Sequence, residues 1–150
     1  MKAVIQRVQR ASVEVDGQVV GEIGKGLLLL LGVEKNDNHA VADKLLNKVL
    51  GYRVFPDAEN KMNLSLKDIQ GGLLVVSQFT LVADTNKGLR PSFSAAAEPE
   101  QARELYEYWV KEAEKSIKHV ATGQFACDMQ VSLQNDGPVT FILEAHSGAN

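Results

Sequence analysis

The chain has 150 residues, 45% hydrophobic and 23% charged, a composition typical of an ordinary globular domain with room for a sizeable core. Sixteen Lys and Arg against 19 Asp and Glu give a formal net charge of −3, which excludes a protein that attracts nucleic acid or anionic membranes through its overall charge. The single cysteine, Cys127, excludes an internal disulfide and a cysteine-only metal site, and we expect it to be a small core residue.

The sequence shows neither a membrane segment nor a division into domains. Its longest apolar run, GLLLLLGV at 26–33, is far too short to span a bilayer, and the N-terminal MKAVIQRV turns polar before a signal-type apolar stretch develops. No internal repeat, low-complexity tract or linker interrupts the chain. We therefore expect a cytoplasmic protein, without contact to membranes, that forms a single domain over residues 1–150.

The first third of the chain predicts three strands and a helix. Alternation rich in Val and Ile runs through residues 2–34, with Asp16-Gly17 as a turn and a second break at 24–26. Asn or Asp at 36–38 can cap a following helix. Apolar residues recur there at helical spacing, namely Val41, Leu45, Leu46, Val49 and Leu50.

The rest of the chain predicts two loops, two strands and a second helix. Residues 55–65 and 84–94 have loop composition, and between them GGLLVVSQFTLVA at 71–83 is an apolar strand of the buried kind. Pro99 starts a helix that runs to about Lys118, with Tyr106 and Trp109 in the core. The last segment, from Gln124 to Gln134, alternates as a strand with one buried side. Strands grouped with two helices favour an α+β fold, either a barrel or a curved sheet.

Three polar stretches are candidates for a functional site. SQFTL at 77–81 ends the buried strand, and its backbone N–H groups can form an oxyanion hole or simply satisfy local carbonyls. In NKGLRPSF at 86–93, Lys87 and Arg90 can contact a phosphate or merely cover a surface turn. In QNDGPVTFILEA at 134–145, Asp-Gly is a hairpin signal, but the next residue is a proline.

A general base for hydroxyl chemistry is missing from the sequence pattern. His39 lies at a helix start, His119 at a helix end and His146 in the C-terminal tail, so none is expected beside SQFTL. The chain has no Gly-x-Ser-x-Gly elbow, P-loop, dinucleotide fingerprint or His-Glu-x-x-His motif. We expect neither a metal ion nor an organic cofactor.

Two of the polar stretches together resemble a known family. SQFTL at Ser77–Leu81 and NDGPVT at Asn135–Thr140 are similar to the signature motif pair of the D-aminoacyl-tRNA deacylases, the bacterial and eukaryotic type once called D-tyrosyl-tRNA deacylase. The pair is specific. The likeness also includes QRVQRASVEV from Gln6 and GLRPSF from Gly88, and it spans essentially the whole chain.

The resemblance implies a fold, a reaction and a set of site residues. The family forms homodimers of α+β subunits, each a β-barrel-like curved sheet with two main helices, and hydrolyses the ester between a D-amino acid and the 3′-terminal adenosine of tRNA. Four groups of residues then receive roles: the catalytic segment Ser77, Gln78, Phe79 and Thr80; the chirality gate Gly137 and Pro138; the supporting residues Arg7, Asn135 and Thr140; and the tRNA 3′-end contacts Lys87, Arg90, Ser92 and Phe93.

The gate follows from the family's Gly-cisPro pair, which enters the active site of the other subunit. An L side chain would collide with this rigid backbone, whereas a D side chain would point to solvent. Glycine has no side chain to reject, so glycyl-tRNA, including that mischarged on tRNA(Ala), is expected to be a substrate as well. The ribose hydroxyl next to the ester can help activate water while the backbone N–H groups of Phe79 and Thr80 stabilise the oxyanion. Thr80 as a covalent nucleophile is the rival mechanism.

Two alternative functions remain open at this point. One is an editing domain of the same fold that removes a wrong L-amino acid, as in the domain attached to archaeal threonyl-tRNA synthetases. The intact GPVT and the lack of a synthetase segment argue against it. The other is a non-catalytic dimeric barrel that binds small ligands or RNA ends.

Overall fold

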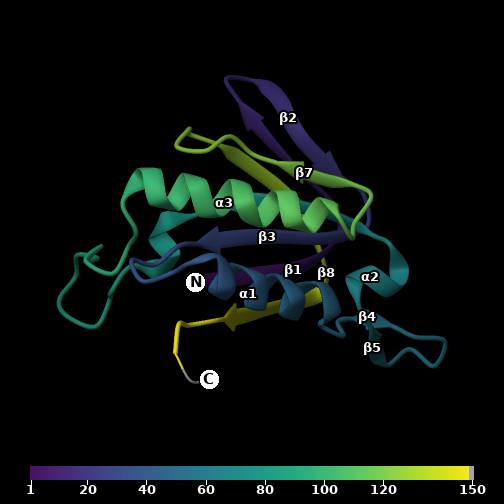
Figure 1. Ribbon diagram of the computed structural model, residues 1–150. Coiled ribbons are helices and arrows are strands. Elements are labelled where there is room, and N and C mark those ends of the chain that lie inside the picture. Colours follow the sequence, from purple (N-terminus) through teal and green to yellow (C-terminus); the bar gives the residue numbers. More distant parts are fainter. Residues whose placement is uncertain (149–150) are drawn as a thin grey trace.

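The computed structural model describes residues 1–148 (Figure 1). Its helices and strands are, in chain order, β1 (Lys2–Val15), β2 (Gln18–Ile23), β3 (Gly26–Gly32), α1 (His39–Gly51), β4 (Phe55–Pro56), β5 (Met62–Leu64), α2 (Leu66–Ile69), β6 (Gly72–Ser77), the short 3₁₀ helix η1 (Phe79–Val82), α3 (Pro99–Glu114), β7 (Val120–Thr122) and β8 (Gln130–Glu144). The fold is therefore α+β. No helix in residues 1–148 is long and apolar enough to cross a membrane.

Six of the strands form one strongly curved sheet. Its order is β2-β1-β3-β6-β7, and β8 pairs with β1 outside this path. The pairs β3–β6 and β6–β7 are parallel, whereas β1 is antiparallel to its three neighbours. The sheet curls until β2 reaches β7, and a Cβ added to Gly21 would lie 2.2 Å from the carbonyl oxygen of Thr122. The expected barrel-like sheet is thus present and nearly closed.

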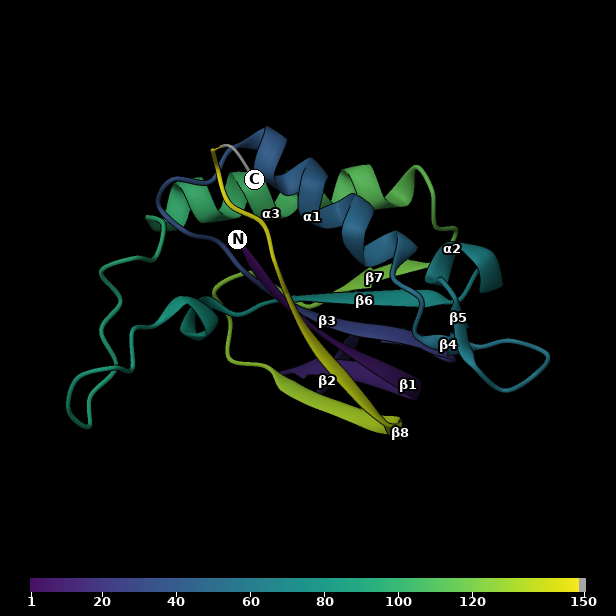
Figure 2. The ribbon, with the colours of Figure 1, turned by 90° about the horizontal axis from the view of Figure 1, so that it is seen from below.

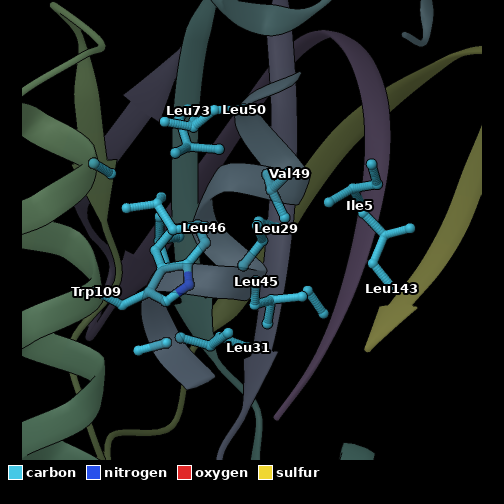
Figure 3. Packing of buried hydrophobic residues seen from close by; sticks show 14 of the residues in the cluster. Ile5, Leu29, Leu31, Leu45, Leu46, Val49, Leu50, Leu73, Trp109 and Leu143 are labelled. Carbon is cyan, nitrogen blue, oxygen red and sulfur yellow. The ribbon is translucent and has the colours of Figure 1, made fainter. Parts of the chain in front are cut away.

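Two hydrophobic clusters lie on opposite faces of this sheet. Figure 2 shows α1 and α3 together on one side, where they cover the larger cluster. Trp109 of α3 is fully buried there, beside Leu45 and Leu46 of α1 and the strand residues of Figure 3. The smaller cluster, on the inner face of the curl, consists of Val8, Ala11, Val13, Ile23, Leu28, Leu74 and Val76. Strand β3 contributes to both clusters, which explains its unbroken run of leucines.

The helices begin where the sequence predicts them. Of the three candidate caps, Asn38 is the one used, and its side chain accepts a 2.9 Å hydrogen bond from the backbone N–H of Val41. Pro99 stands in the first turn of α3, where the missing N–H costs nothing. Tyr106 and Trp109 are buried, as predicted.

Three local predictions were wrong, and one open alternative was resolved. Residues 55–65 form the β4–β5 hairpin and the cap of α2, and the strand predicted over 71–83 ends at Ser77, where η1 follows. Residues 123–129 are a turn, because Ala126 has a φ of 62° and leaves the extended region. Asp136-Gly137 is not a hairpin. It lies within β8, whose pairing with β1 shifts register near Val8.

A close approach between β3 and β6 makes Gly26 indispensable. A Cβ at Gly26 would lie 1.9 Å from the carbonyl oxygen and 2.7 Å from the nitrogen of Gly72, so we expect Gly26→Ala to lower the free energy of unfolding by about 3 kcal/mol or more. The matched control is Gly24→Ala, because a Cβ there meets nothing within 4 Å and should change stability by less than about 0.5 kcal/mol. Urea unfolding of both variants measures the difference, and equal midpoints would contradict the assignment.

Candidate active site

A cavity of about 660 Å³ opens where β3 and β6 end. Because these strands are parallel, their carboxyl ends share one edge of the sheet. The start of α3 and the turn at 123–129 complete the walls. The lining residues are Leu31, Val33, Val76, Ser77, Gln78, Phe79, Ala96, Ala97, Pro99, Ala102, Phe125, Ala126, Cys127, Asp128, Met129 and Val131. The sequence motif SQFTL therefore lies at the edge of a concave, mainly apolar site.

Within this motif, the chain turns sharply from β6 into η1. The backbone N–H of Gln78 still donates to Leu31 in β3, at 2.8 Å. Phe79 and Thr80 are the first residues of η1, so their N–H groups have no acceptor within the helix. No atom of residues 1–148 accepts a hydrogen bond from either group. Two free donors thus stand side by side next to the cavity, the arrangement that stabilises an oxyanion.

The hydroxyl of Thr80 has a polar partner but no base. The Gln78 side-chain amide donates to Thr80 Oγ1, and Thr80 is exposed. The three histidines lie elsewhere, as predicted: His39 stacks on Tyr108 with ring centroids 4.0 Å apart, His119 contacts the carbonyl oxygen of Glu22 at 2.9 Å, and His146 lies beside Glu34 and Glu144. In the described part of the chain, no three His, Cys, Asp or Glu side chains converge to hold a metal ion.

The sequence pattern did not reveal the wall formed by residues 125–129. Phe125 is held against α3, with Arg103 4.8 Å above its ring and Tyr106 5.8 Å from it between ring centroids. Cys127 is exposed and lines the cavity, so its prediction as a core residue was wrong. Alternating apolar residues look the same in a strand and in a turn that lines a cavity, so periodicity gave no signal for this wall.

The loop after η1 brings Ser92 and Phe93 close to the motif. Asp84 and Ser92 exchange two backbone hydrogen bonds of 2.7 and 2.9 Å, which close the loop at its base. The ring of Phe93 then lies 5.2 Å from that of Phe79. Lys87 and Arg90 stand on the exposed loop between these points, and neither forms an ion pair with another residue of the described chain.

The second motif is held by the side chain of Arg7. The Gly137-Pro138 peptide bond is cis, and both residues are exposed. Arg7 donates from Nε to the carbonyl oxygen of Asp136 at 3.1 Å and from Nη1 to that of Val54 at 2.7 Å. It also pairs with the Asp136 carboxylate at 3.3 Å. A guanidinium held at both ends fixes the backbone just before Gly137.

Asn135 and Thr140 hold the backbone on either side of Gly137-Pro138. The Asn135 amide donates to the carbonyl oxygens of Arg7 at 2.9 Å and Val139 at 3.1 Å. Thr140 Oγ1 lies 3.4 Å from Asn135 Oδ1 and accepts from Gln6 at 3.3 Å. The three residues predicted to support Gly137-Pro138 do contact its surroundings.

Within the chain the two motifs lie well apart on the sheet. Ser77 pairs with Leu31, which pairs with Ala3, whereas the Gly137 region lies beside Arg7. Four residues along β1 separate these positions, which is about 13 Å at 3.3 Å per residue. In Figure 2 the bend of β8 accordingly lies far from the loop that follows β6. Neither Gly137 nor Pro138 lines the cavity.

We compared the chain with protein families, with curated proteins and with solved structures. Residues 4–144 match the family model described as D-Tyr-tRNA(Tyr) deacylase. The D-aminoacyl-tRNA deacylases of Cellvibrio japonicus and Haemophilus influenzae are 65% and 62% identical to the chain, covering 96% and 95% of it and 99% of each relative. Among solved structures, the c-Myc DNA unwinding element binding protein has a TM-score of 0.94 at 41% identity, covering 98% of this chain and all of that one. A probable eukaryotic D-amino acid tRNA deacylase shares the fold, with a TM-score of 0.81 at 14% identity over 95% of this chain and 98% of its own.

Proposed function

The chain belongs to the D-Tyr-tRNA(Tyr) deacylase family, and from that membership we propose that it hydrolyses the ester between a D-amino acid and the 3′-terminal adenosine of tRNA. The enzyme is accordingly a hydrolase that releases a free D-amino acid and tRNA. The structural observation that supports this reaction is the pair of free N–H groups on Phe79 and Thr80 beside a cavity large enough for a nucleoside. We infer that it works in the cytoplasm, where tRNA is charged.

The chemistry needs little from the side chains. Water attacks the carbonyl carbon of the ester, and the carbonyl oxygen becomes an anion that accepts hydrogen bonds from the two N–H groups. The bond to the ribose oxygen then breaks, and that oxygen leaves with a proton. The neighbouring ribose hydroxyl lies beside the carbonyl in any aminoacyl ester, so the substrate itself can help activate the water. This account fits a site beside which none of the three histidines lies. The Gln78 amide serves to hold Thr80 in place.

We propose that the chain forms a homodimer, because one edge of β8 is unpaired within the described chain. This 15-residue strand pairs with β1 along one edge, and no other strand of residues 1–148 pairs with it. Its exposed apolar residues are Val131, Leu133, Phe141 and Ile142. Long unpaired strands with exposed apolar side chains commonly pair with another chain. A second copy seated there can bring its own Gly137-Pro138 to the cavity, which the same subunit's pair does not line.

The backbone of the partner's Gly137-Pro138 then serves as the chirality gate. Arg7 and Asn135 hold this backbone from both sides, so it presents fixed main-chain atoms and no rotamers to the substrate. Such a wall rejects any L side chain at its first carbon and leaves D side chains unselected. A glycyl group passes for the same reason.

Contact with tRNA is confined to the acceptor end in this proposal. Lys87 and Arg90 neutralise the last phosphates, while Ser92 and Phe93 border the cavity entrance. Few phosphates are involved, so a net charge of −3 is compatible with binding and the salt dependence should be shallow.

The panel of substrates that tests the function includes D-tyrosyl-, L-tyrosyl-, glycyl-, L-alanyl- and L-seryl-tRNA. We expect deacylation of the D-tyrosyl and glycyl esters, with the L-alanyl ester more than about 200-fold slower, because a steric wall discriminates more than the 10- to 200-fold available to a pocket sensing one methylene. Release of labelled amino acid over an enzyme concentration series measures the rates. Hydrolysis of L-seryl-tRNA alone would indicate an editing domain, and no hydrolysis at all a binding protein. Protection of glycyl-tRNA where D-tyrosyl-tRNA is cleared would disprove the steric gate.

A further inference from the structure

An exposed aromatic pair extends outward from the cavity. The side chain of Phe79 is 62% exposed and that of Phe93 40% exposed, and their ring planes are inclined by 52°. Phe79 lines the cavity, but Phe93 does not. The pair therefore begins at the rim and continues away from it, on the side where the 83–98 loop leaves η1.

The position of Phe93 is set by its own loop. The two Asp84–Ser92 hydrogen bonds fix the residue before it, and the N–H of Ala96 donates to the carbonyl oxygen of Phe93 at 3.1 Å. Ala96 and Ala97 of the same loop line the cavity. Phe93 is thus an aromatic residue anchored through its backbone and partly exposed, and such residues commonly contact planar groups.

We propose that this aromatic pair binds the cytidine that precedes the terminal adenosine of the tRNA, with the base stacked on the ring of Phe93 and Phe79 supporting that ring from the cavity side. This inference rests on the proposed function. When the terminal adenosine occupies the cavity of about 660 Å³, the preceding base is placed at the rim, where Phe79 borders the cavity. The aromatic pair gives that base a surface, and Lys87 and Arg90 on the same loop supply the charge that its phosphate requires. Stacking on aromatic side chains is the common way to hold single-stranded nucleic acid.

The test compares two minimal substrates, the D-tyrosyl esters of adenosine and of the dinucleotide cytidylyl-adenosine. The parent enzyme should show a higher kcat/KM for the dinucleotide ester. In Phe93→Ala the ratio of the two kcat/KM values should fall about 5- to 50-fold, mainly through KM, because a stacking partner of the second base is lost. Phe93→Trp should keep the ratio, since tryptophan also offers a stacking face.

Met62→Ala is the matched control, because Met62 is also half-exposed and apolar but lies in β5, away from the cavity. Its ratio should equal that of the parent. A parent ratio near one, or a Phe93→Ala ratio equal to the parent's, would overturn the stacking site while leaving the deacylase function intact. A parent that hydrolyses neither ester nor D-tyrosyl-tRNA would instead disprove the proposed function. Circular dichroism of each variant confirms that the comparison concerns folded protein.

Discussion

Replacement of Phe79 by proline is expected to slow single-turnover hydrolysis of D-tyrosyl-tRNA about 100- to 1000-fold relative to replacement by alanine. Proline has no backbone N–H, so one of the two oxyanion donors disappears. The local structure accommodates the change. Phe79 is the first residue of η1, where proline's fixed φ is suitable, and Gln78 before it, with φ −142° and ψ 86°, lies outside the helical region that a following proline disfavours.

Phe79→Ala is the control that makes this comparison specific. Both variants lose the aromatic ring and its contact with Phe93, but only the proline variant loses the N–H. Their rate ratio therefore isolates the backbone donor, whatever the ring contributes to binding. Equal single-turnover rates would show that this N–H does not stabilise the transition state.

If the backbone N–H groups stabilise the oxyanion, the hydroxyl of Thr80 is not required for hydrolysis. Its hydroxyl meets the Gln78 amide and no base, so Thr80→Ala should keep substantial deacylation as long as the backbone N–H groups stay in place. Single-turnover rates on D-tyrosyl-tRNA measure this, and mass spectrometry of quenched samples searches for an acylated enzyme. A loss of several orders of magnitude, or an acyl group trapped on Thr80, would establish the nucleophile mechanism instead.

The second large effect concerns the proposed interface. Ile142→Asp is expected to convert the dimer into monomers and to reduce D-tyrosyl-tRNA deacylation by at least about 100-fold, because a buried unpaired carboxylate is costly and the gate comes from the partner. The side chain of Ile142 is 71% exposed in the single subunit, so the substitution leaves the fold of that subunit undisturbed. Analytical ultracentrifugation measures the mass, and activity is assayed at the same protein concentration.

Val19→Asp provides the matched control on another strand. Val19 is 53% exposed in β2, and the same substitution there should leave both the dimer and the activity unchanged. A dimeric Ile142→Asp protein would show that β8 is not the interface. Fully active monomers would show that the site is not shared between subunits.

Features that depend on neighbouring residues could be predicted without coordinates. The three opening strands, a helix cap among residues 36–38 and the amphipathic helix from Pro99 were predicted from alternation, capping chemistry and helical spacing, all of which act over a few residues. The pair of motifs at 77–81 and 135–140 likewise indicated the family without any structure, since it depends only on residue identity.

Features that depend on residues far apart in the chain became visible only in the folded structure. Phe125 and Cys127 alternate with polar residues just as strand residues do, yet they line the cavity because Arg103 and Tyr106 hold the turn against α3. Asp136-Gly137 has the composition of a hairpin, yet β8 runs through it because β1 continues to pair on either side. In the same way, only the strand register shows that the two motifs lie well apart in the folded chain. Local propensity is worth a few tenths of a kcal/mol to about 1 kcal/mol per residue, and contacts with distant segments outweigh it.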